Sequence, residues 1–557
     1  MGKLIKKIAL LFLFVNITCI LHAQNNTILS TESIIVKTNT TIQLTGETLY
    51  YQLYCLNKDS TLSDISEIAY VEIINSYKES VFKNKINLRN GLGSGDFFTP
   101  TTLPTGNYKI IAYTSWMLNN QQNNFFEVDI TIINPFQENI NLTVYKANEK
   151  SNTYTSETKN NILSINKEKY SKREKASLLI PKTLESGNYF LSIRKIDSIP
   201  ALSNNKTSNT DLHLKQDLIA LPETRGEILT GHISSKIVNS ELRSKIVTLS
   251  IPGKNFIFKT TETDRNGKFI FVIDKQTNIS DSYLQLSEPD RANYYITIDK
   301  EPAPDLSNLV FSNKTAISVK NLKAIQQRSL ATQIENTYFS QKKDSIIESN
   351  DTDVFFQTTE KKYNLDDFDR FRTFKETIIE IITELNFKDY NQVPSLYLAD
   401  TRNNVIQSSE PCLVLVDGLQ IQDLTTLYSY NAYQIQSISV VSAPYYYGPK
   451  LFNGIVSIIT KNNDFATIYS DKNILKATIP RPEPTKLYYE PKYESNTSNR
   501  IPDYRYQLLW KPSIRLQNTE MIIPFYISDI SGDFEIILEG LSDKGDIIHF
   551  DKIFKVE

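Results

Sequence analysis

Apolar and polar residues alternate along much of the chain, in runs of about five to nine positions. Leu49, Tyr51 and Leu53 occupy every second position of one such run. A period of two sends successive side chains to opposite faces, which indicates a strand with one buried face. Glycine, proline and asparagine cluster between the runs as turn signals. Residues 28–135 are therefore predicted to form a β-sandwich.

Similar runs continue in three later stretches. Residues 140–200 are predicted to form a second sandwich, residues 225–300 a third, and residues 500–557 a C-terminal β-sandwich or sheet. Residues 198–224 are rich in Ser, Asn and Thr, which is typical of a linker. We therefore expect these β-units to be separate domains.

Two segments of the first predicted sandwich resemble the α2-macroglobulin family. Residues Thr45 to Tyr51 are similar to the G-E-x-hydrophobic opening of that family's second domain, and Leu103 to Lys109 are similar to a strand near its end. The resemblance implies an immunoglobulin-like sandwich. Full-length macroglobulins trap proteases with a Cys–Gln thioester, but no Cys-x-Glu-Gln occurs in this sequence.

The third predicted sandwich resembles a different small domain. Residues Gly226 to Ile233 open it, and Thr263 to Phe271 give a turn followed by a strand. This pattern is similar to the carboxypeptidase-regulatory-like domain, a transthyretin-like sandwich. The resemblance implies an accessory domain of the kind fused to outer-membrane receptors.

Residues 350–462 change character and predict a small α+β domain. Apolar positions spaced by threes and fours predict a helix over residues 365–386. Three strands are then expected: an apolar run ending in Asp417-Gly418, a second over residues 435–441, and a third that follows Gly448 and contains Gly454.

That order of strands resembles the plug domain of TonB-dependent outer-membrane receptors. The residues that carry the resemblance are Asp417, Gly418, Gly448 and Gly454. A simpler interpretation is that these glycines and aspartates only build turns. Receptor plugs sit inside a barrel of roughly 22 strands made by the same chain. Residues 462–557 are too few for such a barrel, so we expect a plug-like domain without its own barrel.

The resemblances together predict a mainly β, multidomain chain. Tandem immunoglobulin-like sandwiches, of the macroglobulin and carboxypeptidase-regulatory-like kinds, precede the plug-like α+β domain and a C-terminal β segment. Envelope proteins of this arrangement share a C-terminal signature that resembles Ile501 to Arg505 and Leu509 to Pro512. No activity follows from that signature.

Composition narrows the possible functions. The formal net charge is −2, whereas nucleic-acid binding depends on a clustered basic surface, so the composition does not favour a nucleic-acid partner. Aromatic content of 11% favours β-structure. The four histidines are scattered and stand at no metal-ligand spacing, so no metal or other cofactor is expected. No nucleophile elbow or phosphate loop is present, and we predict no enzyme and no catalytic residue.

The first residues predict export. Residues 1–23 have a basic start, a short apolar run and a small residue before a cleavage point, as a signal peptide does. A lipoprotein anchored at Cys19 is the alternative, although residues 16–18 make a poor lipobox. No later stretch is apolar for long enough to span a bilayer as a helix. The expected location is the periplasm, in association with the outer membrane.

A cluster of tyrosines is the candidate contact surface. Tyrosine combines a large contact area with a polar tip and is common at interfaces; the alternative is that half of these residues fill the local core. The cluster consists of Tyr428, Tyr430, Tyr433, Tyr445, Tyr446 and Tyr447.

Two functions remain from the sequence. In the first, the plug-like domain contacts or occludes an outer-membrane β-barrel protein or translocon made by another chain, and the sandwiches act as docking arms. In the second, the chain is a periplasmic or surface module that binds a polysaccharide or protein ligand.

Overall fold

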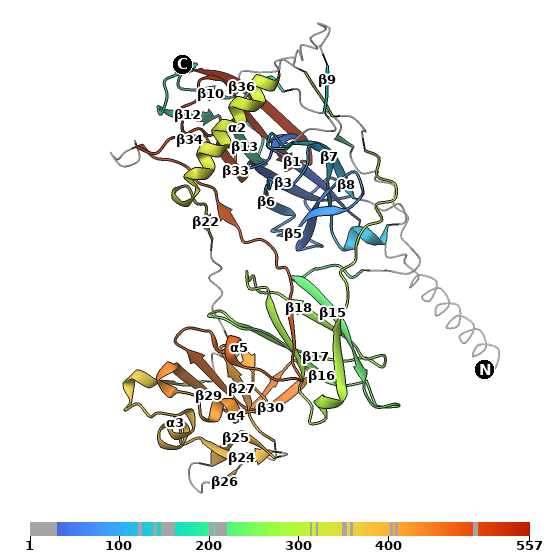
Figure 1. Ribbon diagram of the computed structural model, residues 1–557, viewed down its shortest axis with the longest axis vertical. Coiled ribbons are helices and arrows are strands. Elements are labelled where there is room, and N and C mark those ends of the chain that lie inside the picture. The colour runs from blue at the N-terminus through green and yellow to red at the C-terminus, as the bar shows by residue number, and fades with distance from the viewer. Residues whose placement is uncertain are drawn as a thin grey trace, which may run out of the picture.

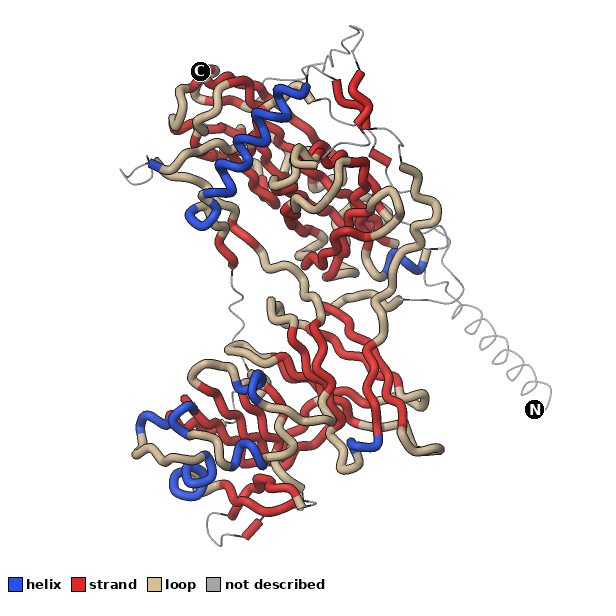
Figure 2. The backbone as a smooth tube through the Cα atoms, viewed as in Figure 1, coloured by secondary structure: helices blue, strands red, loops and turns tan. Residues whose placement is uncertain are grey.

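The computed structural model shows a mainly β, multidomain chain, which confirms the predicted fold class (Figures 1 and 2). The structure describes residues 31–120, 125–137, 142–145, 162–199, 205–206, 220–311, 315–318, 321–347, 354–356, 360–390, 392–400, 405–406, 410–493 and 500–557. The predicted signal peptide, residues 1–23, lies outside this set. Within it, no helix is long and apolar enough to cross a bilayer.

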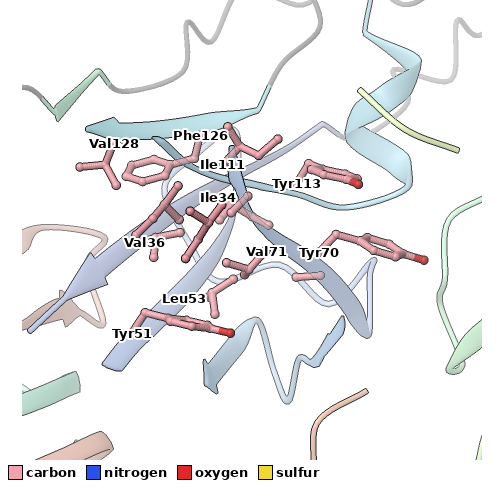
Figure 3. Packing of buried hydrophobic residues seen from close by; sticks show 14 of the residues in the cluster. Ile34, Val36, Tyr51, Leu53, Tyr70, Val71, Ile111, Tyr113, Phe126 and Val128 are labelled. Carbon is pink, nitrogen blue, oxygen red and sulfur yellow. The ribbon is translucent and has the colours of Figure 1, made fainter. Parts of the chain in front are cut away.

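The first sandwich packs a three-stranded sheet, β1-β3-β6, against a sheet of order β14-β8-β7-β4-β5 in which β2 also pairs with β8. Ile34, Leu53, Ile111 and Phe126 meet between the sheets (Figure 3). Its elements are β1 (Glu32–Thr38), β2 (Ile42–Leu44), β3 (Thr48–Asn57), β4 (Ile68–Ile74), β5 (Ser80–Asn87), β6 (Leu92–Phe98), β7 (Gly106–Tyr113), η1 (Trp116–Asn119), β8 (Phe126–Ile133) and β14 (Asn205–Lys206).

The second sandwich is built from two distant parts of the chain. Its sheets have the orders β10-β12-β34 and β11-β36-β35-β13-β33. The strands are β10 (Ser164–Ile165), β11 (Lys169–Tyr170), β12 (Lys175–Ile180), β13 (Gly187–Lys195), β33 (Gln507–Leu516), β34 (Met521–Tyr526), β35 (Gly532–Ser542) and β36 (Ile547–Val556).

This arrangement corrects the predicted domains 140–200 and 500–557, which are not separate. Strand β13 pairs with β35 on one side and β33 on the other. Side chains of both parts, such as Tyr189 and Leu538, are fully buried in one core. Alternation reveals which face of a strand is buried but not which strand lies beside it, so the pairing was hidden in the sequence.

Residues 227–298 form the third sandwich, which also receives a strand from far along the chain. Its sheets are β18-β15-β20 and β17-β16-β19-β31, with β31 pairing antiparallel to β19. The elements are β15 (Glu227–Ser235), β16 (Ile246–Ile251), β17 (Ile257–Glu262), β18 (Lys268–Ile273), β19 (Asp281–Leu286), η2 (Arg291–Asn293), β20 (Tyr294–Ile298) and β31 (Leu475–Thr478).

The α+β domain carries a five-stranded sheet of order β23-β29-β30-β27-β28 beside a smaller sheet, β24-β25-β26. Its elements are β23 (Lys361–Asn364), η6 (Leu365–Asp367), α3 (Phe374–Ile381), β24 (Leu385–Tyr390), β25 (Val393–Asp400), β26 (Val405–Ile406), β27 (Leu413–Val416), β28 (Leu419–Gln420), α4 (Thr425–Tyr428), η7 (Ala432–Gln434), β29 (Ile435–Tyr447), β30 (Lys450–Thr460) and α5 (Phe465–Ile468).

The helix predicted over residues 365–386 is wrong in extent. Helix α3 begins after Thr373, whose side chain accepts from the backbone N–H of Glu376 while Glu376 caps Thr373 in return. This capping box fixes the start of the helix, and Leu385 already begins β24. The Thr-x-x-Glu spacing was the signal that would have placed the boundary.

The remaining elements connect these domains. Residues 470–493, which we call the return segment, run from the α+β domain back to the first two sandwiches (Figure 1). Helix α2 (Leu322–Thr337) packs beside those sandwiches. The other elements are β9 (Leu142–Tyr145), β21 (Thr315–Ser318), η4 (Phe339–Gln341), β22 (Ser345–Ile346) and β32 (Lys486–Leu487).

Candidate functional site

Asp417, the first residue of the predicted plug motif, has a structural role. Its fully buried carboxylate accepts from the backbone N–H and the hydroxyl of Thr460, each at 2.7 Å, and from the N–H of Phe465 at 3.3 Å. Burial raises the pKa of this carboxyl, although the three donors oppose the rise. The side chain therefore joins the end of β30 to the start of α5.

The glycines of the motif permit close packing. Gly418, at φ +87°, follows Asp417 in the turn between β27 and β28, and an added Cβ would stand 2.2 Å from Cβ of Phe256 in the third sandwich. Gly448 approaches Thr260 of the same sandwich, and Gly454 lies against Leu398. Turns and close packing account for these three glycines and Asp417, which agrees with the interpretation that the motif residues build turns.

The tyrosines of the α+β domain do not form one surface, which corrects the predicted contact cluster. Tyr445 and Tyr447 point inward, and the ring of Tyr447 stacks on Phe355 with centroids 4.0 Å apart. Tyr446 lies between them and is 77% exposed, because successive residues of a strand face opposite sides.

The other tyrosines of the cluster are also divided. The ring of Tyr430 packs edge-on against Phe465, and that of Tyr428 against Phe387. Tyr433 is half exposed. Only Tyr433 and Tyr446 therefore present much of their rings to solvent, and they come from separate elements.

A cleft that the sequence did not predict lies where the first sandwich, the second sandwich, helix α2 and the return segment meet. Its volume is about 190 Å³. We call it the aromatic cleft, after the side chains that line it: Tyr50, Phe339, Tyr488, Tyr489, Tyr504, Tyr506 and Trp510. These residues come from regions up to several hundred positions apart, so no local pattern signals the cleft.

Stacked rings form one wall of the aromatic cleft. Trp510 of β33 stacks on Tyr50 of β3 with ring centroids 5.9 Å apart, and Tyr488 meets Tyr50 edge-on at 4.9 Å. Trp510 is 4% exposed, and its ring also packs against that of Phe190. Because both sandwiches and the return segment contribute a ring, this wall exists only when the domains are assembled.

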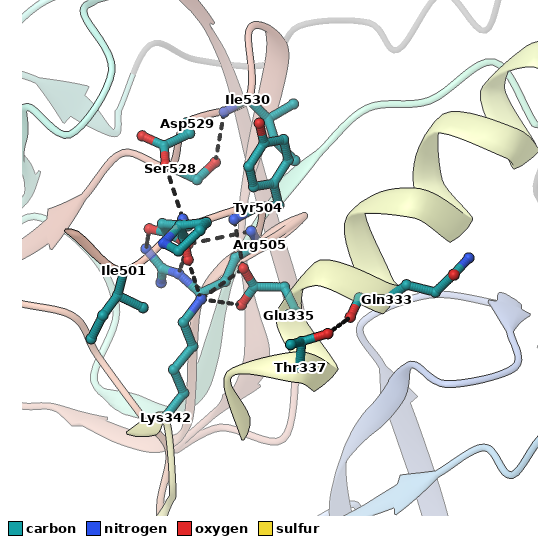
Figure 4. Close-up of polar contacts among 12 residues, drawn as sticks. Gln333, Glu335, Thr337, Lys342, Ile501, Tyr504, Arg505, Ser528, Asp529 and Ile530 are labelled. Atoms are coloured by element: carbon teal, nitrogen blue, oxygen red, sulfur yellow. Dashed lines mark hydrogen bonds and ion pairs between the residues drawn. The ribbon is translucent and has the colours of Figure 1, made fainter. Parts of the chain in front are cut away.

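Paired charges hold another part of the cleft lining in place (Figure 4). Lys342 donates to Glu335 of α2 at 2.7 Å and to the carbonyl of Pro502, and the backbone N–H of Tyr504 donates to the same carboxylate. Arg505 makes two bonds to Asp503, at 2.7 and 2.8 Å. This network gives the Ile501–Arg505 signature a structural role: it holds Tyr504 against helix α2.

Arg328 anchors helix α2 to Glu47, which lines the aromatic cleft. Its guanidinium is 1% exposed, makes two bonds of 2.6 Å to Glu47, and contacts Asp197 at 2.8 Å. Burial opposes ionisation of Glu47, but Arg328 more than offsets this and lowers the pKa of the carboxyl. Both carboxylates are therefore committed to Arg328.

Arg194 of β13 also lines the aromatic cleft, but no described carboxylate binds it as Glu47 and Asp197 bind Arg328. Among the described residues its guanidinium has no hydrogen-bond or ion-pair partner. Burial and the neighbouring Arg328 lower the pKa of Arg194 to about 10, so it remains charged at neutral pH. The cleft thus holds a partly buried cation that pairs with none of the described carboxylates.

Two other clefts are larger, but the cations described in them are already paired. One of about 240 Å³ lies between the third sandwich and the α+β domain, where Lys450 donates to Ser287. The other, of about 440 Å³, lies between the first and third sandwiches, where Arg481 pairs with Glu227. These cations already have partners, so the aromatic cleft is the stronger candidate for a ligand site.

Comparison with known proteins gives no family for the chain. No family model matches it, and no curated protein does. Among solved structures, it aligns with Salmonella α2-macroglobulin reacted with methylamine at 10% identity and a TM-score of 0.25, covering 94% of this chain and 39% of that one. Trypsin-activated α2-macroglobulin from Escherichia coli gives 9% identity, a TM-score of 0.23, and coverage of 94% and 41%.

A further match is the dimeric latent PorU from Porphyromonas gingivalis, at 10% identity, with a TM-score of 0.17 and coverage of 49% of this chain and 34% of that one. The chain spans about two fifths of the length of the macroglobulins it matches. With TM-scores this low, the similarity transfers neither activity nor partners to this chain.

Proposed function

We propose that this chain is a non-catalytic cell-envelope protein that binds a polymeric ligand in the aromatic cleft. The observation that carries the proposal is the convergence of tyrosine, tryptophan and phenylalanine rings from both sandwiches, helix α2 and the return segment. Aromatic rings give large contact areas at little entropic cost, and tyrosine adds a polar tip. Such a wall suits sugar rings or an extended polymer better than a small charged metabolite.

The state of the carboxylates supports binding over catalysis. Glu47 is held by Arg328, and Glu335 by Lys342. General acid–base work needs a carboxyl free to exchange a proton with the substrate. Asp344 accepts from the N–H of Tyr489 and has no second carboxyl paired with it in the cleft. The signal-peptide pattern of residues 1–23 supports an envelope location.

A printed array of bacterial-envelope glycans and extended peptides tests the proposed function. Phe339 is 62% exposed and Tyr504 is 36% exposed, so either can be replaced by alanine without emptying a core. Each substitution should weaken binding by roughly tenfold or more. Phe136→Ala, which removes a 53% exposed ring that does not line the cleft, is the matched control. An array without hits, or hits that survive both substitutions, would refute the proposal.

A second candidate function uses the α+β domain to contact or occlude an outer-membrane barrel or translocon made by another chain. One face of the β29–β30 hairpin favours it, because the paired residues Tyr446 and Leu451 are exposed there. Tyr446→Ser should then abolish co-purification with a barrel from gently solubilised membranes. A mature protein found alone in the soluble periplasmic fraction would exclude this role while leaving the aromatic cleft unaffected.

A further inference from the structure

We infer that the ligand of the aromatic cleft is a carboxylated saccharide whose carboxylate is bound by Arg194. The inference rests on the proposed function and adds the chemical class of the ligand. It depends on the unpaired guanidinium, on the accessibility of the neighbouring strand and on the distribution of charge along the cleft.

Arg194 is the cation that lacks a partner. Glu47 and Asp197, the carboxylates closest to it in electrostatic effect, both bind Arg328. A partly buried guanidinium beside a second arginine is unfavourable unless an anion approaches it. Its planar donors suit a carboxylate, which accepts two parallel N–H bonds. A ligand carboxylate would therefore supply the negative partner that Arg194 lacks among the described residues.

Strand β33 borders the cleft, yet it is poorly suited to pair with a peptide. The carbonyl of Leu508 accepts from Arg505 at 2.7 Å, and that of Leu509 accepts from the side chain of Gln507 at 2.7 Å. Peptide addition to a sheet edge relies on free main-chain groups. Since side chains already occupy these carbonyls, the cleft favours a ligand recognised by its ring faces and substituents.

Arg194 and Asp344 both line the cleft, but different charged groups act on them. Those that act most on Arg194 are Arg328, Glu47 and Asp197, whereas those that act on Asp344 are Asp96 and Lys486. A saccharide can place its carboxylate at Arg194 and present hydroxyl groups to the free oxygen of Asp344, which accepts from Tyr489 with its other oxygen.

Isothermal titration calorimetry on the full mature chain tests the inference with matched probes. The probes are oligosaccharides of galacturonate, alginate and hyaluronan, each beside its methyl-esterified, neutral form. We expect at least one acid form to bind roughly tenfold or more tightly than its ester, with the preference declining as salt rises. Arg194→Gln should abolish this preference and leave ester binding unchanged.

The control is Arg243→Gln, which removes one positive charge from an exposed position on the third sandwich. It should leave both affinities unchanged. Equal binding of acid and ester would overturn the role of Arg194 while the proposed function stands. If no saccharide binds but a carboxylate-terminated peptide does, the saccharide class is wrong. If neither binds, and Tyr504→Ala changes nothing on the array, both proposals fail.

Discussion

Lys85 of the first sandwich and Glu227 of the third form a buried ion pair, with Nζ 2.5 Å from Oε1 and side-chain exposures of 4% and 2%. The other oxygen of Glu227 accepts from Arg481 of the return segment at 2.8 Å. A single carboxylate thus joins three parts of the chain. Neutralising Glu227 leaves the buried guanidinium of Arg481 without a carboxylate among the described residues, whereas Lys85 keeps its ion pair with the more exposed Glu301.

Glu227→Gln should therefore destabilise the junction by about 3 kcal/mol. Hydrogen–deuterium exchange of the β15 amides should accelerate by roughly a hundredfold, since every 1.4 kcal/mol is a factor of ten. Asp274→Asn is the control, because it removes an exposed pair with Lys259 and should cost less than about 1 kcal/mol. Equal exchange in the two variants would show that the network does not hold the junction.

Glu223 should make the same junction sensitive to pH. Its carboxyl is 1% exposed and accepts from Tyr70, Ser115 and the N–H of Ile228. Burial raises its pKa to about 7, above the usual value of 4.5. The folded state therefore favours the protonated form, and this contribution is fully present below about pH 4.5 and lost as pH rises through about 7.

The size of the effect is roughly 3 kcal/mol across that range. The measurement is the thermal unfolding midpoint of the wild type and of Glu223→Gln between pH 4.5 and pH 8. The wild type should lose stability relative to the variant as pH rises. Parallel profiles for the two proteins would contradict the assignment.

Asp417→Asn should weaken the α+β domain by about 1–3 kcal/mol. Asparagine tolerates the left-handed backbone that Asp417 adopts at φ +51°, so the substitution isolates the loss of the bonds to Thr460 and Phe465. Limited proteolysis between α4 and β29 reports the loss. Asp423→Asn, at a partly exposed turn, should leave the cleavage rate near that of the wild type.

Gly418→Ala should loosen the contact between the α+β domain and the third sandwich. The new methyl group would overlap Phe256, and the backbone has φ +87°, which alanine rarely adopts. Small-angle scattering should record a larger radius of gyration. Gly106→Ala serves as the comparison, because its Cβ would lie 3.6 Å from the nearest atom, and unchanged dimensions in both variants would rule out the tight contact.

Local features of this fold could be predicted from the sequence, whereas long-range ones could not. The strand at Leu49–Leu53 and the turn at Asp417-Gly418 depend on neighbouring residues, and both occur as expected. The expectation of one buried face was wrong, because Gln52 on the other face of the strand is buried as well. The pairing of β13 with β33 depends on residues several hundred positions away. Strand periodicity specifies a buried face and contains no information about the partner strand.

The candidate site shows the same limit. Tyr445 to Tyr447 were grouped because they are adjacent in the chain, yet adjacency within a strand separates side chains. Arg194 and Trp510 meet at one cleft because β13 and β33 are neighbours in a sheet. Neither residue stands out until that sheet is known.

The pairing of β13 also orders events during biosynthesis. Residues 187–195 leave the ribosome long before residues 507–542, which supply the strands on both sides of them. Until then β13 has two open edges, a state prone to aggregation. The second sandwich can form only after its late strands have been synthesised, so a truncated product would expose an unfinished sheet to proteases.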